Sequence, residues 1–227
     1  MRRPRIFVNF AITVDGKVTT VALSLSRFTS SYDKRRLLEI RSLGDALLVG
    51  RNTVQTDNMS MGLPDEDLRI ARLQRGQSEY PLRVLISNSG NLSTDLNVFN
   101  HHFSPIVIYS TTSMPEAVKA ALQTKATLHL ADGDRLRLSV VLSDLYETYR
   151  VRTLVCEGGP SLAKALAEID AIDELFLTVA PLLFGGASAP GILGNPGTFL
   201  PSSRIYRLSS MNVESTECYL HYVADRR

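Results

Sequence analysis

Short apolar runs rich in β-branched residues alternate along this chain with amphipathic stretches, and no other feature narrows its fold as much. The runs have the length of strands, whereas the amphipathic stretches repeat their apolar residues at helical spacing. Such alternation indicates an α/β fold in which helices cover both faces of a largely parallel sheet. We therefore predict a three-layer αβα architecture with a mixed, mostly parallel central sheet.

The predicted elements follow one another without a long linker or an internal repeat. Strands are expected at residues 6–13, 46–50, 83–87, 106–110, 127–130, 153–157, 174–180, 205–213 and 217–223. Helices are expected at residues 32–43, 51–57, 115–123, 136–149 and 161–169, and residues 59–80 are expected to form a loop or a short surface helix. The last strands follow the final helix and should be antiparallel. Because α/β domains often reach this length, we predict a single domain over residues 1–227.

The composition argues against several classes of protein. With 25 basic and 23 acidic residues and only 7% aromatic residues, the chain offers no basic face for nucleic acid. The apolar run after the basic N-terminus is too short and too polar for a secretory or membrane segment. Cys156 and Cys218 lack metal-like spacing and are expected to be free thiols in a reducing cytoplasm. The histidines do not indicate a metal site either.

The segment LVCEGGPSLAKAL places an acid, two glycines and a proline where a predicted strand meets a predicted helix. Gly158 and Gly159 allow close approach to a ligand, Pro160 suits the first helical turn, and exposed amides there favour an anion such as a diphosphate. A tight turn with Ser161 helping to cap the helix is the simpler explanation of the glycines alone. Glu157 favours a ligand, because a carboxylate ending an apolar strand is costly without a polar partner.

Two other strand ends are rich in polar residues. Gly50 closes one strand, Arg51 follows at a helix start, and Thr53 offers a hydroxyl in the first turn. These residues are as consistent with a phosphate site as with a capped surface helix that exposes an arginine. Ser87, Asn88 and Ser89 leave another strand as a polar cluster, where a simple turn is the favoured explanation. The chain has neither the glycine fingerprint of a Rossmann fold nor the spacing of a P-loop, which argues against both.

Two charged residues lie at informative positions. Asp15 precedes Gly16 between alternating segments, a pattern that favours a hairpin. Arg41 falls on the apolar face of the predicted helix at residues 32–43. An inward guanidinium needs an anion, which is either an internal carboxylate or the phosphate of a ligand.

Four segments occur in an order that identifies a family: AITVDGK, IRSLGDALLVGRNTV, CEGGPSLAKAL and DELFLTVAPLLFGG. Over residues 5–223 the chain resembles the reductase domain of bacterial and archaeal riboflavin biosynthesis, the 5-amino-6-(5-phosphoribosylamino)uracil reductases. The resemblance implies the dihydrofolate reductase-like fold, NADPH as cofactor, a phosphorylated pyrimidine as substrate, and a homodimer.

The resemblance also implies roles for individual residues. Positions implied to contact NADPH are Ala11, Gly50, Arg51, Thr53, Asp57, Ser87, Asn88, Gly158, Gly159, Pro160, Ser161 and Leu162, and the last run continues through residue 165. Among them, Ser87 and Asn88 align with the site of the 2′-phosphate. Arg41 and Glu157 match substrate-contacting positions, with Glu157 facing the pyrimidine. Glu157 and Asp15 are the candidates for a catalytic role, in binding or in protonation.

The chain also departs from the family's pattern. After Asp57 it reads NMSMGLPDEDLR, without a match for the arginine that helps to bind the substrate phosphate, and Arg69 or Arg72 is the candidate replacement. The loop at residues 19–31 lacks the usual aromatic residue, for which Phe28 is the stand-in. The signature of a zinc deaminase is also missing, so another polypeptide would perform the preceding deamination.

The resemblance therefore implies NADPH-dependent reduction of 5-amino-6-(5-phosphoribosylamino)uracil, with hydride passing to C1′ of the sugar to give the ribityl chain. Two alternatives stay open. One is another NADPH-dependent reductase of the same fold, acting on a pterin, dihydrofolate, a carbonyl or an imine. The other is a catalytically inactive nucleotide-binding regulatory protein, which would bind NADPH without turning over any of these substrates.

Overall fold

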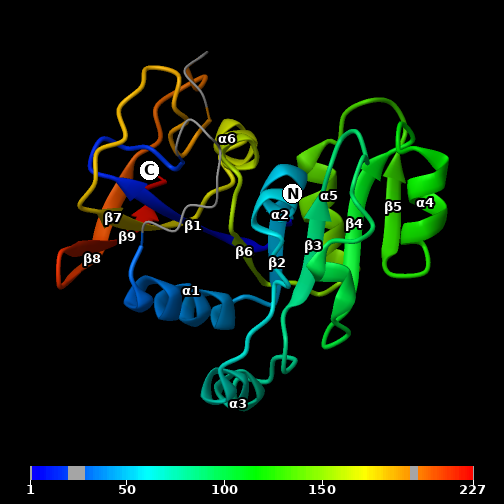
Figure 1. The fold of residues 1–227 in the computed structure, drawn as a ribbon, viewed down its shortest axis with the longest axis horizontal. Helices are drawn as coiled ribbons and strands as arrows, with labels where there is room; N and C mark the ends of the chain where they lie inside the picture. The colour runs from blue at the N-terminus through cyan, green and yellow to red at the C-terminus, as the bar shows by residue number, and fades with distance from the viewer. Residues whose placement is uncertain (1, 20–28, 195–198, 227) are drawn as a thin grey trace. The chain divides into compact units, whose positions relative to one another are not determined.

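The computed structural model describes residues 2–19, 29–194 and 199–226. Contacts between residues divide the chain into two compact units, Met1–Pro4 with Leu38–Val155 and Arg5–Leu37 with Cys156–Arg227. In the described ranges, nine strands form a mixed, mostly parallel sheet, which confirms the predicted α/β class (Figure 1). The single domain over residues 1–227 stays a prediction.

The first unit is built on parallel strands. It contains β2 (Ala46–Gly50), β3 (Leu82–Ile86), β4 (Ile106–Thr111), β5 (Thr127–Ala131) and β6 (Thr153–Cys156), in the order β5-β4-β3-β2-β6. The pairs β2–β3, β3–β4 and β4–β5 are parallel. Every side chain of β4 is buried, as expected for a parallel strand that is covered on both faces.

Helices connect these strands. They are α2 (Arg51–Asp57), α3 (Glu66–Gln74), α4 (Glu116–Leu122) and α5 (Leu138–Glu147), with a 3₁₀ turn, η1 (Asn97–Asn100). α2 starts directly after β2 with Gly50 as its N-cap, and it ends at Asn58, whose φ of 44° is left-handed. Asparagine tolerates that conformation better than most residues, which explains why the helix stops there.

α3 lies in the segment at residues 59–80, for which the sequence leaves a loop or a short helix open. The Asp65 side chain caps it by accepting a hydrogen bond from the Leu68 N–H at 3.1 Å. Glu66 and Asp67 add negative charge to the first turn, where it is favourable. The short helix is therefore confirmed.

The inward residue of α3 is Arg72, whose side chain is fully buried. Its guanidinium donates to the carbonyl oxygens of Ser42 and Gly44, at the C-terminal end of α1 (Ser31–Leu43). The last carbonyls of a helix have no donor within the helix, so Arg72 closes α1 while it anchors α3. Burial lowers the pKa of Arg72 to about 10, and the group therefore stays charged at neutral pH.

The second unit ends in antiparallel strands. It contains β1 (Arg5–Thr13), β7 (Glu174–Ala180), β8 (Tyr206–Glu214) and β9 (Glu217–Ala224), in the order β1-β7-β9-β8, together with α6 (Pro160–Glu168) and the first turns of α1. β1 and β7 are parallel, whereas β9 runs antiparallel to both β7 and β8. The antiparallel ending predicted from the sequence is confirmed.

The first turns of α1 pack on one face of β7 and β9. The rings of Tyr32 and Tyr219 lie 5.0 Å apart between centroids. The Thr178 hydroxyl donates a hydrogen bond to the Asp33 carboxylate. Because Thr178 and Tyr219 are opposite each other across the β7–β9 ladder, these contacts mark the face that α1 covers.

Both cysteines are free thiols, with Cys156 buried and Cys218 half-buried. Burial raises the pKa of Cys156 to about 12, so this thiol is protonated at neutral pH. Among the described residues, no group of histidine, cysteine or acidic side chains is placed to hold a metal ion. None of the helices in the described ranges has both the length and the apolar character needed to cross a membrane.

Candidate active site

Polar side chains of the first unit meet where β2 and β3 end. Gly50 and Ile86 are paired at the ends of these strands, so the residues that follow them lie at the same edge of the sheet. Nη1 of Arg51 lies 3.4 Å from Oγ of Ser89, and its Nη2 donates to Oδ1 of Asn52 at 3.0 Å. A guanidinium beside a hydroxyl and an amide is a donor set that suits a phosphate.

Ser87 and Asn88 shape the turn at this edge. The Ser87 hydroxyl oxygen is buried and accepts a hydrogen bond from the Gly90 N–H at 3.1 Å. Oδ1 of Asn88 accepts one from the Leu136 N–H at 3.0 Å. The side chain beside Arg51 is that of Ser89, the third residue of this polar cluster, to which the family resemblance gives no cofactor contact.

Arg41 points inward, as its place on the helix predicts, and only 8% of it is exposed. Nη1 of Arg41 donates to the carbonyl oxygen of Gly62 at 2.9 Å, so one of its partners is a neutral acceptor. Thr53 and Asp57, at the two ends of α2, are half-buried. The predicted contacts of these three residues with a ligand stay predictions.

The candidate replacements for the family's arginine have other partners. Arg72 as a phosphate ligand is wrong, because its side chain is fully buried among backbone carbonyls. Nε of Arg69 lies 3.1 Å from Oε1 of Glu79, and its Nη1 donates to the carbonyl of Pro64 at 2.7 Å. Both guanidiniums therefore stabilise the segment that contains α3.

In the second unit, α6 begins within one residue of the predicted start. Gly158 has a φ of 95°, which favours glycine, and its peptide bond to Gly159 is cis. Gly159 is the N-cap of α6, and Pro160 occupies the first helical position. Ser161 is exposed and the helix has no side-chain cap, so the expected capping by Ser161 is wrong.

Two other residues of the same segment differ in exposure. Glu157 is half-buried directly after β6 and before the glycine pair. The side chain of Leu162 is buried in the core, so only its backbone could meet a cofactor. On strand β1, Ala11 is half-buried and opposite Thr178 of β7. Phe28 lies outside the described residues.

Asp15 lies in the turn after β1 and holds a segment that is distant in sequence. Its carboxylate accepts hydrogen bonds from the Thr13 hydroxyl, from the Phe184 N–H at 3.2 Å and from the Gly185 N–H at 2.7 Å. The Thr13 hydroxyl, followed by the two amides, holds the pKa of Asp15 below its usual range despite some desolvation. A carboxylate that is kept ionised accepts hydrogen bonds but does not supply a proton at neutral pH.

The turn of the hairpin predicted at Asp15 and Gly16 is confirmed, with the Thr13 N–H bonded to the Lys17 carbonyl at 2.9 Å. Gly16 adopts a φ of 77°, as a tight turn requires. Residues 17–19, however, form no strand. The Val18 N–H bonds to the carbonyl of Pro190 at 3.0 Å, so a distant segment contacts the chain just beyond the turn.

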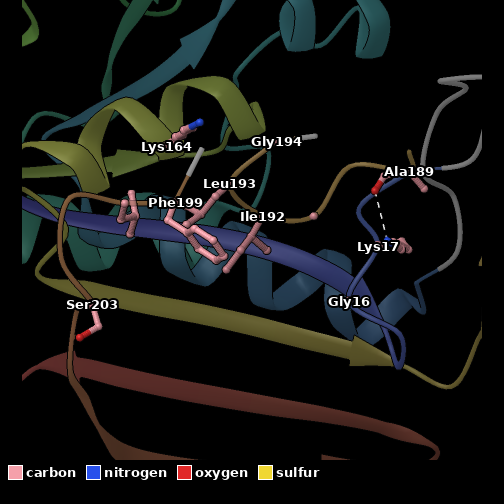
Figure 2. Close-up of a pocket in the computed structure, with 11 residues that line it drawn as sticks. Gly16, Lys17, Lys164, Ala189, Ile192, Leu193, Gly194, Phe199 and Ser203 are labelled. Carbon is pink, nitrogen blue, oxygen red and sulfur yellow. Dashed lines mark hydrogen bonds between the residues drawn. The ribbon is translucent and has the colours of Figure 1, made fainter. Parts of the chain in front are cut away.

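A pocket of about 710 Å³ lies in the second unit. Figure 2 shows the side chains of Ile192, Leu193 and Phe199 lining it, together with Lys17 and Lys164. Its volume is within the range of small-molecule sites, roughly 300–1,000 Å³. Two ammonium groups among apolar walls suit an organic anion.

Sequence reasoning missed this pocket. Lys17 is the lysine of the DGK motif, to which the sequence gives no role, whereas Lys164 falls in residues 159–165, which the resemblance implies to contact NADPH. Much of the wall comes from residues 189–194 and 199–203, for which the sequence predicts no element. Nζ of Lys17 donates to the carbonyl of Ala189 at 3.3 Å, a contact between distant parts of the sequence (Figure 2).

Known proteins resemble this chain over nearly its whole length. The family model described as the RibD C-terminal domain matches residues 4–220. A 2,5-diamino-6-ribosylamino-4(3H)-pyrimidinone 5′-phosphate reductase from Archaeoglobus fulgidus is 28% identical over 206 residues, which cover 91% of this chain and 93% of the relative. A reductase of the same name from Methanothermobacter thermautotrophicus is 29% identical over 195 residues, or 86% of each protein.

The fold also matches a solved structure. A pyrimidine reductase-like protein from Corynebacterium diphtheriae superposes with a TM-score of 0.82 and covers 99% of this chain and 93% of its own. The two sequences are 18% identical, so this likeness establishes a shared fold. The α/β architecture predicted from the sequence is therefore that of a solved pyrimidine reductase-like protein.

Proposed function

Because this chain belongs to the RibD C-terminal domain family, we propose that it reduces a phosphorylated ribosylamino-pyrimidine of riboflavin biosynthesis with NADPH. When bound, NADPH would supply a hydride to C1′ of the sugar; the C1′–O4′ bond breaks and O4′ takes a proton from water, which leaves the open ribityl chain. The protein's share is then to bind and orient the two molecules. Family membership over nearly the whole chain is the observation that carries this proposal.

The first unit supplies the partner for the phosphate that distinguishes NADPH from NADH. Arg51 and Ser89 place a guanidinium and a hydroxyl side by side at the edge where β2 and β3 end. An arginine in such a position is a usual partner for a 2′-phosphate. In this proposal Ser87 and Asn88 shape the turn that presents Ser89, while Thr53 keeps its implied cofactor contact.

The second unit supplies the contact with the pyrimidine. Gly158 and Gly159 have no side chains, so the diphosphate of the cofactor can come close to the backbone at the start of α6. Glu157 directly precedes them and accepts hydrogen bonds from donors on the pyrimidine edge. A carboxylate is suited to this task because it accepts at both oxygens.

The substrate's phosphate requires a cation that the altered motif after Asp57 no longer provides. We assign this role to Lys17 and Lys164, which line the pocket of the second unit, with Arg41 as the candidate of the first unit. A lysine binds phosphate as a point charge and does not need the fixed geometry of an arginine fork.

Asp15 acts as a positioning residue in this proposal. Its carboxylate holds the backbone at Phe184 and Gly185 close to the end of β1. The same stretch continues to Ala189, whose carbonyl accepts from Lys17 of the pocket. Loss of the Asp15 carboxylate would therefore loosen the wall of the pocket without removing an acid from the reaction.

The names of the curated relatives favour a second candidate substrate. The reductases of Archaeoglobus fulgidus and Methanothermobacter thermautotrophicus are named for a pyrimidinone that still carries its 2-amino group. That group and the neighbouring ring N–H form a pair of donors, which matches the two oxygens of Glu157. In the uracil, the N3–H at this edge is flanked by two carbonyl oxygens, which a carboxylate would repel.

A substrate panel tests the proposal. NADPH oxidation should be measured with 5-amino-6-(5-phosphoribosylamino)uracil, with the diamino pyrimidinone phosphate, with dihydrofolate and with simple carbonyl compounds. We expect turnover with at least one riboflavin intermediate, and a higher kcat/KM for the one that Glu157 fits better. Turnover of dihydrofolate alone would favour the other reductase, and NADPH binding without any turnover would favour the regulatory protein.

The family resemblance also implies that the protein forms a homodimer and works in the cytoplasm. Both statements are part of this proposal.

A further inference from the structure

One part of the pocket wall in the second unit has no regular structure. Residues 199–205 form neither helix nor strand, and Phe199, Leu200 and Ser203 line the pocket (Figure 2). We call residues 199–203 the wall segment. Phe199 is 98% exposed, so its ring contributes little packing that could hold this segment in place. The position of the wall segment must therefore depend on other contacts.

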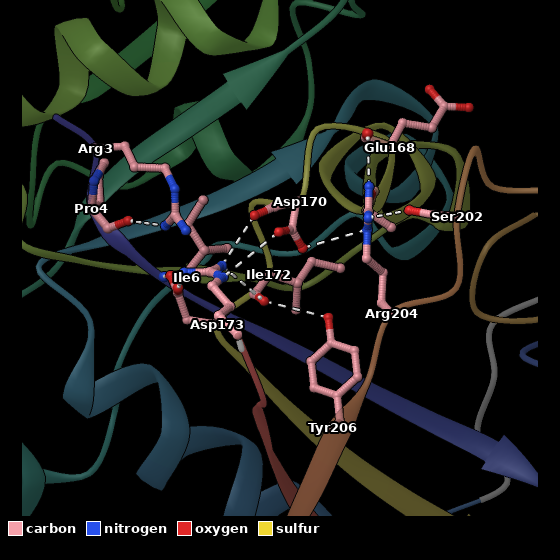
Figure 3. A network of polar contacts seen from close by, with 12 residues as sticks. Arg3, Pro4, Ile6, Glu168, Asp170, Ile172, Asp173, Ser202, Arg204 and Tyr206 are labelled. Atoms are coloured by element: carbon pink, nitrogen blue, oxygen red, sulfur yellow. Dashed lines mark hydrogen bonds and ion pairs between the residues drawn. The ribbon is translucent and has the colours of Figure 1, made fainter. Parts of the chain in front are cut away.

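Arg204 provides such contacts directly after the wall segment. Figure 3 shows its guanidinium bonded to the Ser202 side chain and to the backbone of Glu168. Nη1 donates to Oγ of Ser202 at 2.6 Å, and Nη2 donates to the carbonyl of Glu168 at 3.3 Å. Nε donates to the carbonyl of Ala167 at 3.2 Å. Because Ala167 and Glu168 are the last residues of α6, one planar side chain joins the wall segment to the end of this helix.

The end of α6 is a favourable place for this cation. The last carbonyl oxygens of a helix lack donors from a following turn, and the helix dipole makes that end negative. Oδ1 of Asp170, just beyond the helix, lies 3.4 Å from Nε of Arg204. The helix end and this carboxylate therefore attract the guanidinium from one side, while Ser202 bonds to it from the wall segment.

The link made by Arg204 lies close to Lys164. Lys164 is a residue of α6, and its side chain lines the same pocket as the wall segment (Figure 2). Ala167, which accepts a hydrogen bond from Arg204, follows Lys164 by less than one helical turn. Loss of the link would therefore let the wall segment move relative to the Lys164 ammonium group.

We propose that Arg204 is a positioning residue, which holds the wall segment against α6 and so fixes the place of this wall relative to Lys164. The inference rests on the proposed function, in which Lys164 binds the phosphate of the substrate. Arg204 itself does not touch the substrate. It keeps the pocket in one shape, so that the phosphorylated pyrimidine binds without first ordering the wall segment.

Arg226 offers a matched control. Its Nη1 lies 2.6 Å from Oδ1 of Asp173, and its Nη2 donates to the carbonyl of Asp170 at 3.0 Å. Both contacts are with the turn that follows α6 and not with the wall segment. Replacement of Arg226 therefore reports the cost of losing an arginine beside this turn, without release of the wall segment.

Steady-state kinetics with the phosphorylated pyrimidine test this role. Arg204→Leu should raise KM about tenfold, because a released wall segment must be ordered when the substrate binds. The same substitution should change kcat and the Kd for NADPH by less than about twofold. Arg226→Leu should leave KM within about twofold of the wild type. An unchanged KM in Arg204→Leu, or equal rises in the two variants, would overturn the proposal.

A double-mutant cycle tests whether Arg204 acts through the geometry at Lys164. Lys164→Met alone should raise KM. In that background Arg204→Leu should raise KM by less than about threefold more, since the wall segment no longer has an ammonium group to be placed against. Independent, fully additive effects would show that Arg204 only stabilises the end of α6, and they would overturn the positioning role.

Limited proteolysis separates this inference from the proposed function, because it does not require turnover. Chymotrypsin cleaves after exposed aromatic residues, and Phe199 offers such a site in the wall segment. Cleavage there, located by mass spectrometry, should be at least about five times faster in Arg204→Leu than in the wild type or Arg226→Leu. Equal rates would overturn the link even in an active enzyme. Faster cleavage in Arg204→Leu alone, without turnover of any phosphorylated pyrimidine by the wild type, would support the link and reject the proposed function.

Discussion

The carboxylate of Asp15 accepts a hydrogen bond from the N–H of Gly185 at 2.7 Å, across 170 positions of sequence. The Phe184 N–H bonds to the same carboxylate. A side chain that the sequence places in a local turn therefore organises a long-range contact. The first prediction concerns the ionisation of this group.

We expect Asp15 to titrate below its ordinary pKa of ~3.9, because the Thr13 hydroxyl and two backbone amides stabilise its ionised form. A lowered pKa means that these bonds persist at neutral pH and are lost as the pH falls through the pKa of the folded protein. Carbon-detected NMR of the carboxyl groups would measure it. In Thr13→Val, which removes the first donor, the pKa should rise, and an unchanged value would show that the hydroxyl does not stabilise the carboxylate.

Arg72→Met should destabilise the first unit by about 3 kcal/mol, because several buried carbonyl oxygens lose a charged donor. Urea unfolding followed by circular dichroism would measure this loss. Arg135→Met is the control, since Arg135 is exposed and its replacement should change the free energy of unfolding by less than about 0.5 kcal/mol. Equal effects of the two substitutions would show that the buried contacts contribute little.

Gly90→Ala should cost more stability than Gly76→Ala. Both glycines have a left-handed φ, +62° and +75°, so alanine is strained at both. At Gly90 the added Cβ would also lie 2.5 Å from Cβ of Met114 and 2.7 Å from Oγ of Ser110, whereas nothing lies within 4 Å at Gly76. We expect a difference of about 1–3 kcal/mol in the free energy of unfolding, typical of overpacking. A zero difference would mean that the turn relaxes without cost.

Arg51→Leu should reduce the preference for NADPH over NADH. A charge-assisted hydrogen bond contributes roughly 1.5–3 kcal/mol, so the ratio of the two kcat/KM values should fall about 10- to 100-fold. Arg135→Leu, another exposed arginine of the first unit, serves as the control and should leave the ratio unchanged. A fall in activity with both cofactors to the same extent would count against a contact with the 2′-phosphate.

Glu157→Gln should lower turnover of the pyrimidine while leaving the affinity for NADPH nearly intact. The amide keeps the shape but accepts at only one oxygen, and we expect kcat/KM to fall about 10- to 100-fold. Steady-state kinetics and NADPH fluorescence titration would separate the two effects. Glu168→Gln, at an exposed position of α6, is the control. Equal losses of turnover and cofactor affinity in Glu157→Gln would reject this division of roles.

The strands were predictable from the sequence because burial on both faces leaves a clear signature. β2 (Ala46–Gly50) and β7 (Glu174–Ala180) match their predicted bounds to the residue. α3 was harder to recognise because its buried residue is Arg72, and a guanidinium at the inward position removes the amphipathic pattern. The acidic residues that begin with Asp65 were the remaining signal of its start.

The candidate site was less predictable because much of it depends on partners distant in sequence. The motif around Asp15 correctly indicates a turn, but it does not predict that Val18, just beyond the turn, bonds to Pro190 far along the sequence. Ser87 is as polar as Ser89 in the sequence, yet the fold buries the first and places the second beside Arg51. Local pattern identifies such clusters, whereas tertiary contacts decide which member meets solvent.

The link between Arg72 and the end of α1 limits how far this protein can be shortened. Residues 59–80 contain no strand, so a protein engineer who seeks a shorter protein would delete this segment first. Its deletion would also remove the Arg72 guanidinium, which donates hydrogen bonds to the carbonyls of Ser42 and Gly44. A trimmed design would therefore have to install another donor at that place before the rest of the scaffold could tolerate the cut.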